Sequence, residues 1–388
     1  MSRSIKTEVN PQVFKWLRES AAWTSEDVSK RLKTSVEAVE AIESGEKAPM
    51  LRQLRELSTA YKRPLAAFLL SEPVKEKPKP KDFRMLPDRK DTFDKKTILV
   101  LRKARTLQEI SNELSYNIDY QTKAAVEKAK TSDKPEDLAN NHRMTFELTV
   151  DNQRRFKTSY ELFNYLRDKM EDLNILVFQY SMPVEDARGF TLTDETPNVI
   201  VLNTRDTIEA RIFSLMHEFA HILLGETGID FPDVTISTRN EVEVWCNRFA
   251  SAFLLPADIA MNLFKSNKST LTETDTLNKL SRKYKLSKAM LLFNMLKMDF
   301  ISETEYEDVL ERYKPQETEV AEEEEDEDTE TKAGGIPADV RCLSEIGNKF
   351  VSLVANNYDR NHITYTDALN YLSIKSKNFD KVLANARK

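Results

Sequence analysis

An HExxH motif at residues 217–221 constrains this chain more than any other stretch, because it uses two of the only four histidines. On a helix, side chains four residues apart share a face, with Cβ atoms about 5–6 Å apart. His217 and His221 therefore suit one metal ion, and Zn²⁺ is expected. Glu218 is then placed to take a proton from a metal-bound water. The alternative is a buried helix without an ion, which would bury two imidazoles and a carboxylate at high cost.

A third ligand is expected on a second helix, predicted from residue 240 to 255. Glu243 shares one face of that helix with small or apolar side chains and with Asn247, so a carboxylate buried there needs a cation. Glu241 lies on a more exposed side, which favours Glu243 as the ligand. Cys246 could bind zinc as a thiolate, but a small buried thiol is the favoured role. Asn247 is expected to lie behind the ligands and to support them.

A small sheet is predicted directly before the HExxH helix. Three apolar runs, at residues 175–180, 189–192 and 198–203, have the composition of strands and are separated by turn-rich stretches. Residues 206–209 are typical of a helix start, and the helix is expected to end near Gly225. A small sheet followed by an HExxH helix is the layout of zinc peptidases, in which a sheet edge can align an extended peptide beside the metal.

The first 70 residues are predicted to form five short helices, which makes a compact N-terminal bundle. This part resembles the XRE/Cro-type helix-turn-helix domain, with residues 24–32 as the first helix of the motif and residues 35–42 as the recognition helix. The resemblance implies DNA contacts from Lys33, Ser35 and Lys47. The helices are expected at residues 11–20, 24–32, 35–44, 49–57 and 65–70.

Three glutamates count against DNA binding by this bundle. Glu37, Glu40 and Glu43 are expected on the surface of the recognition helix, where they would face phosphate oxygens, although DNA affinity comes mainly from cationic contacts. Two interpretations stay open: the bundle binds an operator, or it is a scaffold that packs against a protein. The stretch 75–105, with 12 basic and 5 acidic residues, could contact phosphate instead, or it could be a solvated spacer.

Charge and cysteine usage narrow the class of protein and its compartment. The net charge of −6 excludes a globally basic nucleic-acid binder, although local basic patches remain possible. Two cysteines far apart, Cys246 and Cys342, make a disulfide framework improbable and fit a reducing cytoplasm. The chain shows neither an apolar signal core at its start nor an uncharged apolar run long enough to span a membrane, so no membrane partner is expected.

Composition changes along the chain predict its division into parts. Helices are expected at residues 95–128 and 159–170. Residues 277–298 resemble a second helix-turn-helix pair, which is expected to pack within the central domain. His142 and His362 are expected in loops, without a metal-spaced partner. The predicted parts are a helix-turn-helix domain (1–71), a basic Pro/Lys linker (72–94), a metallopeptidase domain (95–314), an acidic disordered linker (315–335) and a small helical module (336–388).

The central part resembles the ImmA/IrrE family of metallopeptidases. The resemblance covers residues 175–256 and is carried by five segments, which are Gly189–Leu192, Ile200–Asn203, Arg211–His221, Glu243–Ala250 and Leu254–Pro256. It implies that His217, His221 and Glu243 bind Zn²⁺ and that Glu218 is the catalytic base. Alanine is usual in the family where Cys246 stands here, and this change leaves the ligands untouched. Family members often carry an N-terminal helix-turn-helix domain and cleave or inactivate a transcriptional repressor.

The sequence therefore predicts a cytoplasmic, mainly helical α+β protein with a zincin-like HExxH domain, a small three-stranded sheet and a C-terminal helical module. The predicted function is that of a zinc-dependent endopeptidase acting on a regulatory protein such as a repressor, with DNA as a further partner through the N-terminal domain or the basic linker. The alternative is a non-enzymatic regulator that binds DNA or a protein and uses the metallopeptidase-like domain as a sensor or scaffold.

Overall fold

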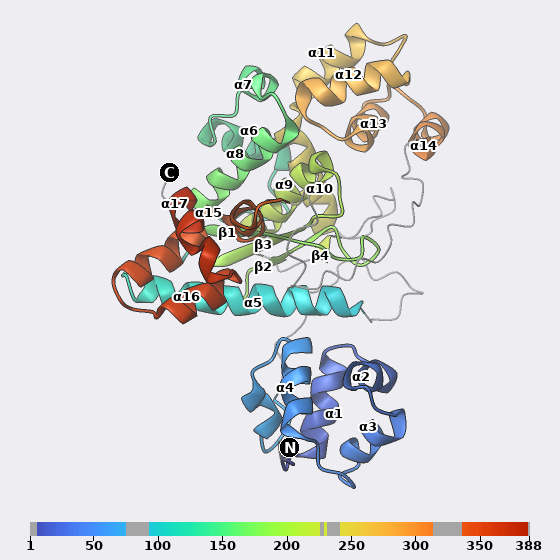
Figure 1. Ribbon diagram of the computed structural model, residues 1–388. Helices are drawn as coiled ribbons and strands as arrows, with labels where there is room; N and C mark the ends of the chain where they lie inside the picture. Colours follow the sequence, from blue (N-terminus) through green and yellow to red (C-terminus); the bar gives the residue numbers. More distant parts are fainter. Residues whose placement is uncertain (1–5, 75–92, 226–228, 231–240, 313–335, 387–388) are drawn as a thin grey trace.

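The computed structural model describes residues 6–74, 93–225, 229–230, 241–312 and 336–386 (Figure 1). Most of these residues are helical, and one small sheet lies near the middle of the molecule, so the predicted α+β class is confirmed. Most of the basic linker and all of the acidic linker predicted from the sequence lie outside the described residues. None of the described helices has the length and apolar character needed to cross a bilayer.

The N-terminal bundle forms as predicted, except that its last helix is a short 3-10 helix. Thr24 caps the second helix in a reciprocal capping box with Asp27, and Ser35 caps the third. Between these two helices Lys33 adopts the left-handed conformation, with φ of 50°, which produces the sharp turn. The bundle consists of α1 (Pro11–Ser20), α2 (Ser25–Leu32), α3 (Val36–Glu43), α4 (Leu51–Ala60) and η1 (Leu65–Leu69).

The sheet contains the three predicted strands and one short strand beyond the prediction. The spatial order is β1-β3-β2-β4, in which β1 is parallel to β3 and β2 is antiparallel to both β3 and β4. Every residue of the first three strands is buried, as expected for a sheet covered on both faces. The strands are β1 (Ile175–Tyr180), β2 (Gly189–Leu192), β3 (Asn198–Asn203) and β4 (Ile229–Asp230).

Alternating side chains divide the core into two layers, one on each face of the sheet. Val177 and Ile200 point toward α9 and join the larger hydrophobic cluster, whereas Phe178 and Val201 point the other way and join a second cluster. On the first face α8 and α9 pack on the strands, and α10 packs on α9 and α6. The helices of this layer are α6 (Pro135–Thr145), α7 (Val150–Arg155), α8 (Ser159–Asp172), α9 (Ile208–Leu224) and α10 (Glu241–Leu254).

The opposite face of the sheet is covered by the long helix α5 and by the C-terminal helices (Figure 1). Phe350 of α15 meets Phe178 of β1 edge to face, with ring centroids 6.1 Å apart. Most of residues 338–386 are helical, as predicted for the C-terminal module, and their buried apolar side chains share one hydrophobic cluster with the sheet and α5. The elements of this layer are α5 (Lys95–Tyr116), α15 (Ala338–Asp359), α16 (Tyr365–Leu372), η2 (Ser376–Asn378) and α17 (Phe379–Ala386).

The helix predicted for residues 95–128 is too long by twelve residues, because α5 ends at Tyr116. Asp119 then takes a positive φ of 52°, and the chain continues without helical structure. Its backbone is bonded elsewhere: Ala125 N–H donates to Leu173 O at 3.0 Å, and Ala129 N–H donates to Leu223 O at 2.8 Å. Tertiary hydrogen bonds along this stretch replace the helical ones.

Four further helices extend the first layer beyond α10, at the end of the molecule farthest from the N-terminal bundle (Figure 1). The predicted helix-turn-helix pair is present there as α12 and α13. Its second helix is largely buried, with Met290, Leu291, Leu292 and Met295 in the larger hydrophobic cluster, so the predicted packing role of this pair is supported. The helices are α11 (Ala257–Ser266), α12 (Thr274–Tyr284), α13 (Lys288–Lys297) and α14 (Glu303–Glu311).

The N-terminal bundle contacts the rest of the protein at the first turns of α5. Lys95 Nζ lies 2.5 Å from Asp27 Oδ2 and 5.5 Å from the centre of the Trp23 ring. Farther along α5, Arg102 Nη1 donates to Tyr61 O at 3.3 Å. Asp27, the capping-box partner of Thr24, is thereby linked to the helix that underlies the sheet.

Candidate metal centre

Helix α9 presents the HExxH motif in the centre of the first layer. Thr207 caps its start by accepting from Ala210 N–H at 3.3 Å, and Gly225 ends it in the left-handed conformation, with φ of 74°. Both limits agree with the prediction. From Ile212 onward α9 is apolar and buried on nearly all sides, so the polar side chains of the motif lie within the core.

Three potential ligand atoms converge between α9 and α10. His217 Nε2 lies 3.2 Å from His221 Nε2, and each of these atoms lies 3.3 Å from a carboxylate oxygen of Glu243. All three side chains have no exposed surface. The two 3.3 Å contacts involve different oxygens of Glu243, Oε2 facing His217 and Oε1 facing His221, and one ligand atom from each of the three residues lies within 4.8 Å of the others. Ligand atoms bound to a tetrahedral zinc are about 3.3 Å apart, so the two imidazole nitrogens fit two corners of such a site and the carboxylate lies beside them, where it can supply a third.

The rotation of α10 about its axis decides which of its carboxylates lies beside His217 and His221. Glu243 faces α9 and is fully buried, whereas Glu241 is exposed. Burial opposes the charged form of Glu243, but its contacts with His217 and His221 hold its pKa below the ordinary value. Cys246 is also buried and does not belong to the cluster of potential ligands found among the described residues.

Asn247 lies directly behind the first histidine, as predicted. The Nδ1 of His217 is 2.9 Å from Asn247 Oδ1, and an amide oxygen can only accept, so the proton belongs on Nδ1. This tautomer leaves the lone pair of Nε2 directed toward His221 and Glu243. The contact thus gives the imidazole the form in which it binds a metal.

Glu218, three residues before His221 on α9, is directed toward strand β2. Its side chain is fully buried, and one of its carboxylate oxygens accepts a hydrogen bond from the Thr191 hydroxyl. A Cβ atom built on Gly189 would lie 3.3 Å from the other oxygen. Thr191 and Gly189 could not be assigned to the site from the sequence, because strand alternation shows that they share one face of β2 but not which helix packs on that face.

Two parts of the chain match protein-family models. Residues 170–296 match the IrrE N-terminal-like domain (Peptidase_M78), and residues 14–68 match the Helix-turn-helix model HTH_3. The chain combines an IrrE-like domain with a helix-turn-helix domain. No curated protein matches the chain. These matches confirm the expected ImmA/IrrE architecture. The protein is metallopeptidase-like and carries an N-terminal helix-turn-helix domain, a fold that is common in DNA-binding proteins.

The match to the IrrE-like domain includes strands β1 to β3, helices α9 and α10, and most of the α12–α13 pair. It therefore contains His217, Glu218, His221 and Glu243. The helix-turn-helix pair of α12 and α13 is therefore part of this domain. Helices α15 to α17, which complete the second layer, lie beyond the matched residues.

His142 is not in a loop, and this prediction was wrong. It lies in α6, which precedes the residues matched to the IrrE-like domain, and its ring centroid is 5.1 Å from that of Phe219 in an edge-to-face arrangement. Burial lowers the pKa of His142 and favours the neutral form. The helical amphipathic pattern of α6 was too weak to recognise in the sequence. His362 does lie in the loop after α15, as predicted.

The predicted DNA-contacting residues lie on the surface of the helix-turn-helix domain. Lys33, Ser35 and Lys47 are all exposed, and the Ser35 hydroxyl accepts from the Ala38 N–H at the start of α3. A hydroxyl engaged as an N-cap acceptor can still donate its proton to a phosphate. Their role in DNA binding stays a prediction.

Glu43 does not face outward, and this part of the argument against DNA binding was wrong. Its carboxylate accepts from Arg18 Nε at 2.6 Å and from Arg18 Nη2 at 3.0 Å, and both side chains are only about a tenth exposed. The hydrogen bond with Glu43 also raises the pKa of Arg18. Only Glu37 and Glu40 remain as exposed carboxylates on α3.

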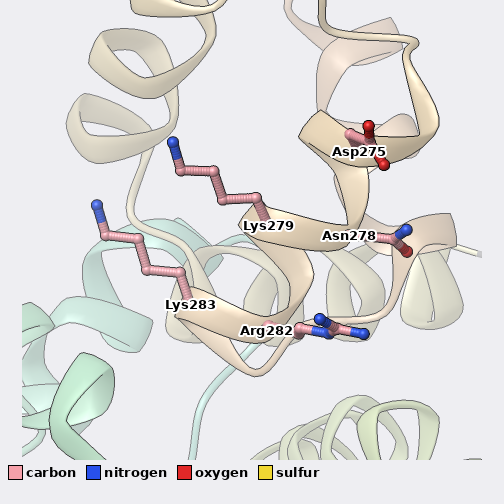
Figure 2. Close-up of a pocket in the computed structure, with 5 residues that line it drawn as sticks. All are labelled: Asp275, Asn278, Lys279, Arg282 and Lys283. Atoms are coloured by element: carbon pink, nitrogen blue, oxygen red, sulfur yellow. The ribbon is translucent and has the colours of Figure 1, made fainter.

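A pocket of about 620 Å³ lies on α12, away from the buried polar cluster. Lys279 and Lys283 extend side by side from one flank of the helix, while Arg282 and Asn278 lie on another (Figure 2). Asp275 completes the lining. The pocket is a shallow polar surface, and none of the residues of the candidate metal centre borders it.

Proposed function

We propose that this protein is a zinc-dependent endopeptidase in which His217, His221 and Glu243 hold the metal and Glu218 is the catalytic base. The observation that supports it best is the convergence of two imidazole nitrogens, 3.2 Å apart, with the Glu243 carboxylate, whose two oxygens each lie 3.3 Å from one of these nitrogens. Two imidazoles and one carboxylate are the ligand set of open catalytic zinc sites, in which a water takes the fourth position. The donor set therefore fits zinc both in chemistry and in spacing.

Each residue of the proposed site has a separate role in hydrolysis of the peptide bond. Bound zinc would polarise the scissile carbonyl and lower the pKa of a water. Glu218 would take the proton of that water on a carboxylate oxygen and return it to the leaving amine, as a general base and then a general acid. Asn247 would hold His217 in the required tautomer. The surrounding apolar core would exclude other water and strengthen the electrostatic interactions.

The proposed substrate is a regulatory protein such as a transcriptional repressor, and the proposed compartment is the cytoplasm. The helix-turn-helix domain supports DNA as a further partner, because it could bring the peptidase to a promoter where such a protein is bound. Cys246 and Cys342 are both buried and not joined in a disulfide, which is compatible with a reducing compartment.

One observation favours a second candidate, a non-enzymatic regulator that uses the metal centre as a sensor or scaffold. His217, Glu218, His221 and Glu243 have no exposed surface, so a peptide bond cannot reach them in this conformation. A peptidase with this arrangement must open before it binds its substrate. A sensor or scaffold would work in the closed state.

Turnover distinguishes the two candidates. The zinc-loaded protein would be incubated with the products of neighbouring genes and with candidate repressors, and the fragments would be analysed by mass spectrometry. We expect a cut by the wild type and none by Glu218→Gln, which keeps the metal ligands but lacks a proton acceptor. Equal zinc content in the two proteins is the control. Cleavage at a normal rate by Glu218→Gln would contradict the mechanism.

A further inference from the structure

The inner face of β2 is built around the carboxylate of Glu218. Gly189 and Thr191 are two residues apart, so both side-chain positions lie on the same face of the strand, toward α9. The register with β3 fixes them further, because Gly189 is opposite Leu202 and Thr191 is opposite Ile200. The strand is thus held firmly where it meets Glu218.

Thr191 contributes a hydroxyl in an otherwise apolar setting. It is fully buried, and its Oγ1 donates to Oε2 of Glu218, which is also fully buried. The same Oγ1 lies 3.3 Å from the backbone oxygen of Glu218. A hydroxyl has only one proton to donate, and a carboxylate is a stronger acceptor than a backbone carbonyl. The Thr191 hydroxyl therefore donates to Oε2 of Glu218. It restrains rotation of the carboxylate.

Gly189 provides the space that the other carboxylate oxygen needs. A Cβ at this position would be 2.9 Å from Val201 O and 3.3 Å from Oε1 of Glu218. The first distance requires the backbone of the strand to shift, and the second would press on the carboxylate. Glycine therefore allows α9 and β2 to approach each other closely enough for the Thr191 bond.

We propose that Thr191 is a positioning residue for Glu218, which holds Oε2 so that Oε1 is the oxygen that exchanges the proton, and that Gly189 makes this arrangement possible. The inference rests on the proposed peptidase function. Its physical basis is that a general base acts efficiently only within hydrogen-bond reach of its proton, and a fixed carboxylate need not be reoriented during the reaction.

Two substitutions of Thr191 test this role. Thr191→Val keeps the shape of the side chain but removes the hydroxyl, and we expect kcat to fall by about 10–100-fold, the usual effect of losing an outer hydrogen-bond partner. The KM and the zinc content should change little. Thr191→Ser retains the hydroxyl and should restore most of the lost kcat. A wild-type kcat in Thr191→Val, or no rescue by Thr191→Ser, would overturn the proposal.

A matched control exists at the start of α5. The hydroxyl of Thr97, which is also buried, donates to Asp186 Oδ2 at 2.6 Å, remote from the metal centre. Thr97→Val removes the same kind of threonine–carboxylate bond and should lower stability while leaving kcat unchanged. A similar loss of kcat in both valine variants would assign the effect to general destabilisation.

A double-mutant cycle gives a readout that needs no substrate. The free energy of unfolding would be measured for the zinc-loaded wild type, Thr191→Val, Glu218→Ala and the double variant, since alanine removes the acceptor that glutamine would keep. If the hydroxyl bonds to the Glu218 side chain, the double variant should lose less unfolding free energy than the sum of the two single losses, because both substitutions remove the same bond. Additive losses would show that Thr191 does not hold Glu218. Absence of cleavage by the wild type would instead refute the proposed function and leave the outcome of this cycle unaffected.

Discussion

At the scale of single residues, the candidate metal centre depends on which carboxylate α10 turns toward α9. Glu243 and Glu241 are two positions apart, and this difference of about 200° around the helix separates a fully buried carboxylate from an exposed one. A buried carboxylate in contact with two imidazoles is stable only if a proton or a metal ion balances its charge. The proposed zinc site satisfies that need.

Removal of the Glu243 carboxylate should abolish zinc binding. Glu243→Ala leaves two protein ligands, so we expect zinc and activity to be lost together. Glu241→Ala is the matched control, because it removes an exposed carboxylate from the same helix turn and should be nearly silent. Metal analysis of the purified variants measures both. Full zinc occupancy in Glu243→Ala would refute the assigned ligand.

Asn247 should affect the reaction more than metal content. Asn247→Ala removes the acceptor of the His217 Nδ1 proton but leaves the three proposed ligands in place, so we expect most of the zinc to be retained and activity to fall by about 10–100-fold. Zinc affinity and kcat, measured on the same preparations, separate the two effects. Complete loss of zinc would instead make Asn247 essential to the site itself.

At the scale of elements, a buried ion pair within α8 joins this helix to the backbone of α15. Glu171 Oε1 lies 3.2 Å from Arg167 Nε, and Glu171 Oε2 accepts from Lys349 N–H at 2.8 Å. The two side chains fill a kink in α15 at Gly347, where φ is 78° and a Cβ would be 2.0 Å from the Glu171 carboxylate. Only glycine can occupy this position, so the kink and the ion pair depend on each other.

Stability should fall as this carboxylate loses its proton. Burial raises the pKa of Glu171 to about 7, although Arg167 works in the opposite direction. The folded protein therefore binds the proton more tightly than the unfolded chain, whose pKa is near the ordinary 4.5. Stability from this group is complete below pH 4.5 and decreases as the pH rises toward 7. Thermal unfolding from pH 4.5 to 8 should show this decrease in the wild type.

The matched variant for that measurement is Glu171→Gln. It keeps the size of the side chain but cannot ionise, so its melting temperature should depend less on pH over the same interval. Equal pH dependence in the two proteins would show that Glu171 does not titrate there.

At the scale of the whole molecule, the protein is a stack of layers with the helix-turn-helix bundle at one end. The bundle contacts α5 through Lys95 and Arg102, and α5 underlies the sheet whose opposite face carries the metal centre (Figure 1). Helix α3 lies away from this contact, so its exposed residues remain accessible to a partner. DNA binding by this end would therefore not require the layers to separate.

Binding of the full chain to duplex DNA should depend on the exposed lysines of the bundle. Replacing both Lys33 and Lys47 with alanine should weaken binding and reduce the slope of log K against log salt by about 2, if each contacts one phosphate. Glu37→Gln with Glu40→Gln should strengthen binding, because both carboxylates are exposed on α3. Titrations of labelled duplex at several salt concentrations measure these effects, and an unchanged slope in the lysine variant would exclude these contacts.

Glu43→Gln is the control that separates charge from folding. Glu43 is paired with Arg18 inside the bundle, so this variant should lower the stability of the domain. It should have little effect on the electrostatic potential at the surface that faces DNA. A gain in DNA affinity as large as that of the Glu37 and Glu40 variants would contradict the internal pairing.

The sequence alone determined the features that depend on local geometry. Helical spacing places His217 and His221 on one face, apolar runs define the strands, and capping residues such as Thr207 mark where helices start. These patterns involve neighbours in the chain, whose relative positions follow from backbone geometry. The same argument predicted the burial of Glu243 from the composition of its helix face.

Only the tertiary structure decided how distant segments meet. Nothing local to β2 reveals that Thr191 bonds to Glu218, that Glu43 pairs with Arg18 across the bundle, or that His142 packs on Phe219. The extent of α5 and the layer formed by α15 to α17 were settled in the same way. Each of these contacts joins residues at least 25 positions apart, and such pairs are selected by how whole elements pack, which no short pattern in the sequence records.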